Sequence, residues 1–163
     1  VNDFLKQVGP VDAAAELYAG SGNLTPAILA VATRVVTVES DAEAVARARQ
    51  SAWADDASDR LTICGADAAT EAQRLLDADL WVLDPGRPGA KDAISAISDG
   101  GPRHIVYVSC AHDTLRRDIR TLQQAGYTLK DVALIDTFPH TPHFETVALL
   151  HRKDREKAEN TAR

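Results

Sequence analysis

Two glycines and two carboxylates follow consecutive apolar runs, in positions where an alternating strand–helix chain binds ligands. Gly20 and Gly22 come after the first run and let the backbone turn sharply and approach a ligand closely. Glu39 ends the second run, and a carboxylate there can accept both hydroxyls of a ribose. Asp67 follows the third run, where an acid can accept from an adenine amino group. Together these residues favour an adenosyl ligand.

Simpler interpretations of the same residues remain open. Any tight turn from a strand to a helix can produce the Gly-x-Gly pattern, and Glu39 or Asp67 can be a helix-capping or solvated acid. A diphosphate ligand is less well supported. The third glycine of the dinucleotide pattern falls on Thr25, and no Gly-Lys-Ser/Thr follows.

A second group of reactive residues follows later apolar runs. Asp84 and Arg87 come after the fourth run, Cys110 follows the fifth, and Glu145 lies where the last run begins. An α/β sheet gathers such positions along one rim, at the carboxyl ends of its strands. A cysteine after an apolar strand is often a buried small hydrophobe; this is our expectation for Cys64, and it stays open for Cys110.

The elements that must position these residues are short apolar runs alternating with helical patterns. We predict strands at 13–18, 34–39, 60–64, 79–84, 104–109, 131–138 and 144–151, and helices at 23–32, 41–54, 68–77, 90–98 and 113–125. This alternation predicts a doubly wound, mostly parallel α/β sheet. Only a short turn separates the last two strands, so they form a C-terminal antiparallel hairpin. The arrangement is typical of the Rossmann-like class I S-adenosylmethionine (SAM) methyltransferases.

Three motifs carry a more specific resemblance. They are LDPGRPG at 83–89, VYVSC followed by TLRRD at 106–118, and FPHTPHFE at 138–145. With these motifs, residues 13–150 resemble the SAM-dependent RNA uracil-C5 methyltransferases, which make 5-methyluridine in tRNA and ribosomal RNA. The sequence departs from that family at Ala111-His112, where the family has Asn-Pro.

The resemblance implies a role for each reactive residue. C5 of uracil is a poor nucleophile until a thiolate adds to C6, and a base must later remove the C5 proton. By the resemblance, Cys110 is the nucleophile and Glu145 the base, while Asp84, Arg87 and His140 line the substrate pocket. The implied SAM-binding residues are Glu16, Tyr18, Gly20, Gly22, Asn23, Glu39, Asp67 and Asp84.

Composition limits the partners of the chain. Hydrophobic residues make up 45% and charged residues 26% of the 163 residues, which excludes disordered and fibrous classes. The net charge of −6 argues against a chain that grips RNA by itself. No apolar run is long enough for a membrane span, and two cysteines favour a reducing, cytoplasmic setting. Several histidines and cysteines suggest zinc, but without a Cys-x-x-Cys pair we expect no metal.

The expected domain organisation is a catalytic domain at 13–151, preceded by an upstream remnant or helix at 1–12 and followed by a charged tail at 152–163. The chain has no methionine and begins with valine, which predicts a segment of a longer protein. In the resembling family the RNA-gripping modules lie upstream, so we expect an isolated catalytic domain with little activity alone. The alternatives are a class I SAM methyltransferase with a non-RNA substrate, and a SAM-binding paralogue without catalysis.

Overall fold

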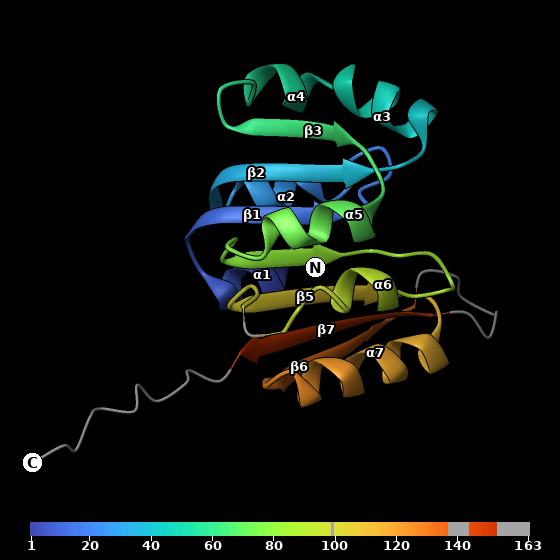
Figure 1. Cartoon of the computed structure of the whole chain (residues 1–163). Helices are drawn as coiled ribbons and strands as arrows, with labels where there is room; N and C mark the ends of the chain where they lie inside the picture. Colours follow the sequence, from blue (N-terminus) through green and yellow to red (C-terminus); the bar gives the residue numbers. More distant parts are fainter. Residues whose placement is uncertain (99, 137–143, 153–163) are drawn as a thin grey trace, which may run out of the picture.

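The computed structural model describes residues 1–98, 100–136 and 144–152, which build one mixed β-sheet flanked by helices (Figure 1). Among these residues seven strands are arranged in the order β3-β2-β1-β4-β5-β7-β6. They are β1 Val11–Leu17, β2 Ala32–Glu39, β3 Leu61–Gly65, β4 Leu80–Leu83, β5 His104–Ser109, β6 Tyr127–Ile135 and β7 Glu145–Arg152. The first five run parallel, while β7 pairs antiparallel with both β5 and β6. The predicted parallel sheet with a C-terminal antiparallel hairpin is therefore confirmed.

The helices are mostly shorter than their sequence patterns predict. They are α1 Asn2–Val8, α2 Thr25–Leu29, α3 Ala42–Arg49, α4 Ala52–Asp56, α5 Ala68–Ala72, α6 Lys91–Ile94 and α7 His112–Gln124, with a 3₁₀ turn at Gln73–Leu75. The pattern at 41–54 forms two helices, because the backbone becomes extended at Ser51 (ψ 140°). Within the described ranges, no helix combines the length and the apolar character that a membrane crossing requires.

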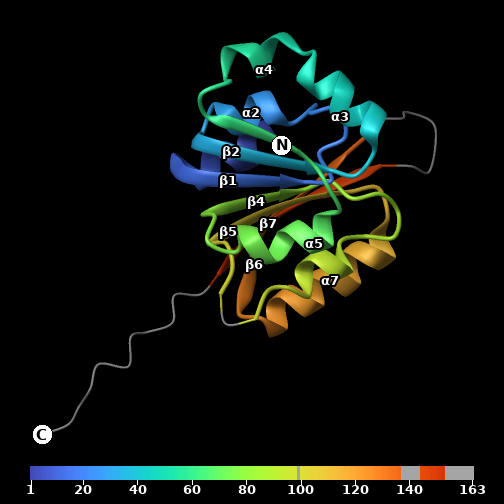
Figure 2. The same cartoon turned by 45° about the horizontal axis from the view of Figure 1, so that its top comes forward.

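Side chains of the inner strands are buried on both faces of the sheet. In β4, Trp81 and Leu83 belong to one core cluster, whereas Leu80 and Val82 belong to the other. This alternation follows from the two-residue period of a strand. Helices α5, α6 and α7 cover the first face, and α1 and α2 cover the second (Figures 1 and 2). The sheet is thus doubly wound, as the apolar runs predict.

The sixth strand begins earlier than predicted, at Tyr127 rather than at residue 131. Tyr127 is 2% exposed, and its hydroxyl donates to the carbonyl oxygen of Pro102 at 2.7 Å. Its pairing with Arg152 across the hairpin extends β6 toward α7. Both contacts join residues far apart in the sequence, so the local pattern does not reveal them.

Helix α1 packs against the second face of the sheet. Its Phe4 and Leu5 are 6% and 1% exposed and belong to the same core cluster as α2. The amide Nε2 of Gln7 donates to Asp131 Oδ2 on β6 at 2.9 Å, across 124 residues of sequence. The segment preceding β1 is therefore part of the packed structure.

Candidate active site

The residues singled out by the sequence follow strands that end at the same rim of the sheet. The last pairs of β1 with β2 and of β1 with β4 lie level with one another. The next residues along these strands, Tyr18, Glu39 and Asp84, therefore meet at this rim, where the parallel arrows point together (Figure 1). Ligands of open α/β sheets bind at this carboxyl edge.

The loop after β1 is tightly turned. Tyr18, Gly20 and Gly22 all have positive φ, at 63°, 56° and 83°. The N–H group of Gly20 donates to Glu39 Oε2 at 2.8 Å, which fixes the loop to the end of β2. A Cβ atom on Gly22 would lie 2.5 Å from the ring of Trp53 in α4, so the glycine is required by close packing as well as by backbone conformation.

Glu39 and Asp67 each hold local backbone groups. Glu39 accepts from the backbone of Gly20 with one oxygen and from the backbone of Asp41, at 2.8 Å, with the other. Asp67 caps α5 by accepting from the N–H group of Thr70 at 2.9 Å, so the helix-capping interpretation holds for it. A carboxylate has about four acceptor positions, and these bonds leave room for ribose or adenine donors.

Two acids in this region have raised pKa values. Burial raises the pKa of Glu16, which is 1% exposed, to about 7; the hydroxyl of Thr25 donates to it and lowers the pKa, and the charge of Asp84 raises it. Partial burial and then the charge of Glu145 raise the pKa of Asp84 to about 6. The structure therefore brings Glu16, Asp84 and Glu145 close enough for their charges to interact.

Cys110 and Glu145 lie at adjacent strand ends. The last pair between β5 and β7 joins Ser109 to Thr146, and one further step along both strands reaches Cys110 and Glu145. Opposed residues of antiparallel strands have Cα atoms about 5 Å apart. Cys110 is exposed, so its interpretation as a buried small hydrophobe is wrong, whereas Cys64 is half-buried against the core.

His112 adds a group that stands out in the sequence as a departure from the family motif and to which we assign no role in the reaction from the sequence. Its ring stacks on Phe144 with centroids 4.2 Å apart and planes at 26°, and its Nδ1 lies 3.5 Å from Thr146 Oγ1. These contacts join the start of α7 to the residues on either side of Glu145. A histidine following the cysteine was the available signal, but its partners are more than 30 residues away.

The remaining predicted residues have different surroundings. The Tyr18 side chain is half-buried, and burial, followed by the charges of Asp67 and two other acids, raises its pKa to about 12. Arg87 is exposed in the loop after β4. Asn23 is exposed and borders a cavity of about 510 Å³ between α1 and α2. His140 lies outside the described residues.

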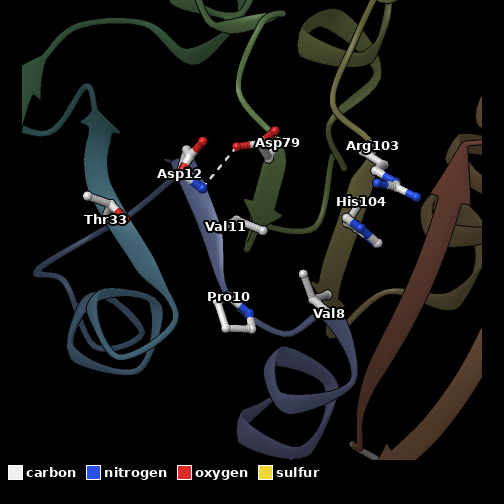
Figure 3. Close-up of a pocket in the computed structure, with 8 residues that line it drawn as sticks. All are labelled: Val8, Pro10, Val11, Asp12, Thr33, Asp79, Arg103 and His104. Atoms are coloured by element: carbon white, nitrogen blue, oxygen red, sulfur yellow. Dashed lines mark hydrogen bonds between the residues drawn. The ribbon is translucent and has the colours of Figure 1, made fainter.

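A separate cavity lies at the opposite edge of the sheet (Figure 3). Its volume is about 450 Å³, and it is lined by Val8, Pro10, Val11, Asp12, Thr33, Asp79, Arg103 and His104. Asp79 Oδ2 accepts there from the N–H group of Asp12 at 3.1 Å. None of the residues predicted to bind SAM or uracil lines it. In the described part of the chain, His, Cys, Asp and Glu form no cluster of three suited to a metal ion.

The model of the family described as tRNA (uracil-5-)-methyltransferase matches residues 6–153. The chain belongs to this family. A relative within the family, the 23S rRNA (uracil(1939)-C(5))-methyltransferase RlmD of Aeromonas hydrophila, is 37% identical over 150 residues. That alignment covers 90% of this chain and 34% of the relative. The RlmD of Photobacterium angustum is 36% identical, with 92% of this chain and 70% of that protein covered.

Solved structures of other methyltransferases share the fold of this member of the tRNA (uracil-5-)-methyltransferase family. The Pyrococcus abyssi tRNA (uracil-54, C5)-methyltransferase, in complex with S-adenosyl-L-homocysteine, superposes with a TM-score of 0.78 at 25% identity. The superposition covers 91% of this chain and 36% of the P. abyssi chain. The N-methyltransferase NodS of Bradyrhizobium japonicum shares the fold at 15% identity, with a TM-score of 0.66. The chain thus spans about a third of the A. hydrophila and P. abyssi enzymes.

Proposed function

We propose that this chain carries out SAM-dependent methyl transfer to C5 of a uridine in tRNA or ribosomal RNA, through a covalent bond between Cys110 and C6. The observation that carries the proposal is the meeting of an exposed thiol with two acids at one rim. Cys110 follows β5, Glu145 begins the strand paired with it, and the charge of Asp84 interacts with Glu145. The RlmD relatives are named for uracil C5 of 23S rRNA, which supports the same reaction class.

The rim after β1, β2 and β3 suits SAM. The turn formed by Gly20 and Gly22 brings backbone close to a ligand, and Glu39 beside it keeps acceptor positions for ribose hydroxyls. Asp67 lies near the Tyr18 side chain, where adenine would bind. The charge of Asp84 acts on Glu16 and that of Glu145 on Asp84, and we assign Glu16 and Asp84 to the methionine end of SAM. The P. abyssi relative was solved with S-adenosyl-L-homocysteine, in agreement with this assignment.

The protein groups act on the uracil in three steps. The thiolate of Cys110 bonds to C6, and the electron pair of the C5–C6 double bond becomes available at C5. SAM supplies the methyl group that C5 takes up. Glu145 then accepts the proton from C5, the C5–C6 double bond re-forms, and the C6–S bond breaks to return the thiolate. Cys110 is regenerated, and the net change is replacement of a C5 hydrogen by methyl.

The residues around Cys110 and Glu145 would position the uracil ring. Asp84 and Arg87 follow β4, the strand paired with β5, and we assign them, together with His140, to the uracil pocket. The net charge of −6 gives the chain little general attraction for phosphates. We therefore assign the grip on RNA to parts of a longer protein, and expect this chain alone to have little activity.

The decisive experiment uses RNA that contains 5-fluorouridine at the target site, with the whole protein. Glu145 cannot remove fluorine from C5, so the Cys110–C6 bond should persist as an adduct that survives denaturing electrophoresis. Cys110→Ala should give no adduct and no methyl transfer, with S-adenosylhomocysteine affinity unchanged. Glu145→Gln should instead accumulate the adduct on natural RNA.

Two results would contradict the proposal. Absence of an adduct with the unaltered protein, under conditions where it binds the RNA, would exclude the covalent step. Methyl transfer that survives Cys110→Ala would indicate a class I methyltransferase with different chemistry, and a substrate other than uracil C5.

A further inference from the structure

The loop that joins β4 to α6 is fastened to helix α7 through its own backbone. The hydroxyl of Thr114 donates to the carbonyl oxygen of Arg87 at 3.0 Å. The guanidinium of Arg117 donates to the carbonyl oxygen of Pro88 at 2.9 Å. The N–H group of Ala90 donates to Asp118 Oδ2 at 2.8 Å. Three side chains on one stretch of α7 thus bind three backbone groups of this loop.

Asp118 is the buried centre of these contacts. It is 1% exposed, and besides Ala90 it accepts from the Tyr107 hydroxyl at 2.7 Å and from Arg117 Nε at 2.8 Å. The position lies on the core face of α7, three residues after Leu115 and four before Leu122, where an apolar side chain would normally pack. A buried carboxylate is tolerated only when its oxygens are satisfied, and an apolar residue is often at least as stabilising. Its presence therefore calls for a purpose other than core packing.

Gly89 supplies an independent sign of close contact between the loop and α7. Its φ is 80°, and a Cβ atom there would lie 2.6 Å from Asp118 Oδ2 and 2.7 Å from Arg117 Nη2. Any side chain would push the loop away from the helix and strain the backbone. Gly89 on the loop and Asp118 on α7 therefore both contribute to the close contact between the loop and the helix.

We propose that Asp118 is a positioning residue, which fixes the loop that carries Asp84 and Arg87 relative to Cys110. The inference rests on the proposed function. The loop begins at Asp84, Tyr107 lies in β5 three residues before Cys110, and α7 begins two residues after it. By bonding Ala90, Tyr107 and Arg117 together, Asp118 connects the loop to both elements that flank the thiol.

The physical reason is the geometric demand of the transfer step. The uracil ring must lie in line with the thiol of Cys110 and with the methyl group. A displacement of the uracil ring by about 1 Å can lower the rate by about 100-fold. The loop is seven residues long from Asp84 to Ala90 and contains no strand or helix of its own. Besides the contacts to α7, the loop is held by its two ends, by the buried Pro85 and by the Ala90 N–H group, which also donates to the Tyr107 hydroxyl at 3.0 Å.

The test compares Asp118→Asn, which keeps the size of the side chain, with Leu122→Ala as a matched control. Asparagine has an N–H₂ group in place of one carboxylate oxygen. That group faces one of the donors from which Asp118 now accepts a hydrogen bond, so at least one of these bonds must break. Leu122 lies one turn further along α7, is fully buried and makes no bond to the loop. The control therefore weakens the fold without releasing the loop.

Two measurements on the whole protein distinguish positioning from general destabilisation. In Asp118→Asn we expect faster hydrogen exchange for the amides of residues 84–90, with β4 and β5 unchanged. We also expect kcat for methyl transfer to fall by about 10- to 100-fold, while KM for SAM stays unchanged. Leu122→Ala should lower the free energy of unfolding but leave both readouts unchanged in the folded protein.

The possible failures are distinguishable. If the unaltered protein transfers methyl and forms the adduct, but Asp118→Asn keeps full kcat, the positioning role is wrong and the proposed function stands. Unchanged loop exchange in Asp118→Asn would likewise overturn the positioning role. If the unaltered protein neither transfers methyl nor forms the adduct, the proposed function itself fails, and the positioning role with it.

Discussion

The carboxyl of Glu16 lies in the sheet at the end of β1, with 1% of the residue exposed. Removal from water disfavours the charged form, so its pKa rises from 4.5 to about 7 although Thr25 donates a hydrogen bond to it. Asp84, at the neighbouring strand end, is more exposed; partial desolvation and then the charge of Glu145 raise its pKa to about 6. These acids thus hold or release protons near neutral pH, where most carboxylates are fully charged.

Glu16→Gln should make stability less dependent on pH. The folded state binds the Glu16 proton more tightly than the unfolded chain, so this contribution is fully present below pH 4.5 and is lost as the pH rises through about 7. Relative to the unaltered chain, the variant should gain up to about 3 kcal/mol in free energy of unfolding between about pH 5 and about pH 8. Urea denaturation across this range measures the difference. Exposed Glu43→Gln is the control, and a gain of equal size there would contradict the assignment.

The contacts of His112 bear on the orientation of Glu145. Its stacking on Phe144 holds the start of β7, and therefore Glu145, against the start of α7. His112→Ala should lower kcat by about tenfold through loss of alignment, with little change in S-adenosylhomocysteine affinity. Asp113→Ala, at the next and exposed position, should leave kcat unchanged. Equal rates for His112→Ala and the unaltered protein would show that the stack does not orient Glu145.

Among the elements, the turn from β1 to α2 carries the strictest backbone requirements. Its glycines adopt positive φ, and only Gly22 is also closely covered, by Trp53 of α4. The turn, to which we assign SAM binding, thereby contacts a helix that follows β2. The second helical segment within the predicted helix at 41–54, α4, places Trp53 over the turn.

Gly22→Ala and Gly20→Ala separate the requirement for positive φ from the requirement for close packing against Trp53. Both substitutions place a side chain at positive φ, at a cost of about 1 kcal/mol in free energy of unfolding. A Cβ at position 20 meets no atom within 4 Å, whereas one at position 22 meets the Trp53 ring at 2.5 Å. We expect Gly22→Ala to lose at least about 1 kcal/mol more than Gly20→Ala, and to bind S-adenosylhomocysteine more weakly. Thermal denaturation and calorimetry measure both effects; equal losses would contradict the role of Trp53.

At the scale of the whole molecule, the net charge bears on which ligands this chain binds by itself. It carries a net charge of −6 and covers 34% of the A. hydrophila RlmD. Phosphate contacts supply much of the affinity for RNA, and an acidic surface provides few of them. In the proposed site, the small adenosyl ligand binds at one rim of the sheet, which needs no such surface.

The chain by itself should therefore bind S-adenosylhomocysteine but hold RNA weakly. We expect an RNA dissociation constant in the non-specific range, about 10⁻⁴ to 10⁻⁶ M, and a low single-turnover rate. Glu39→Gln, which retains one carbonyl acceptor, should weaken S-adenosylhomocysteine binding by about tenfold. Calorimetric titration and RNA fluorescence anisotropy test the two arms. Tight RNA binding by this chain would show that it contains its own RNA-binding surface.

The sequence by itself determined the sheet, its winding and the rim at which the reactive residues collect. Apolar runs buried on both faces and the strand–helix alternation are local patterns, so the order of elements follows from them. The glycine turn, Glu39 and Cys110 were predicted in the same way, because each lies at or just after the end of an apolar run. Short helices and exact strand ends were less predictable, since capping and pairing partners such as Tyr127 and Arg152 are distant in the sequence.

Only the tertiary structure decided how these residues act on one another. The proximity of Cys110 to Glu145 depends on the register between β5 and β7, and a single-residue shift would turn Glu145 to the other face. The pKa of Glu16 near 7 and the burial of Asp118 likewise depend on packing between elements, which local sequence does not encode. Sequence patterns specify which residues a strand presents at its end; long-range packing sets their distances, their protonation and the contacts that hold them.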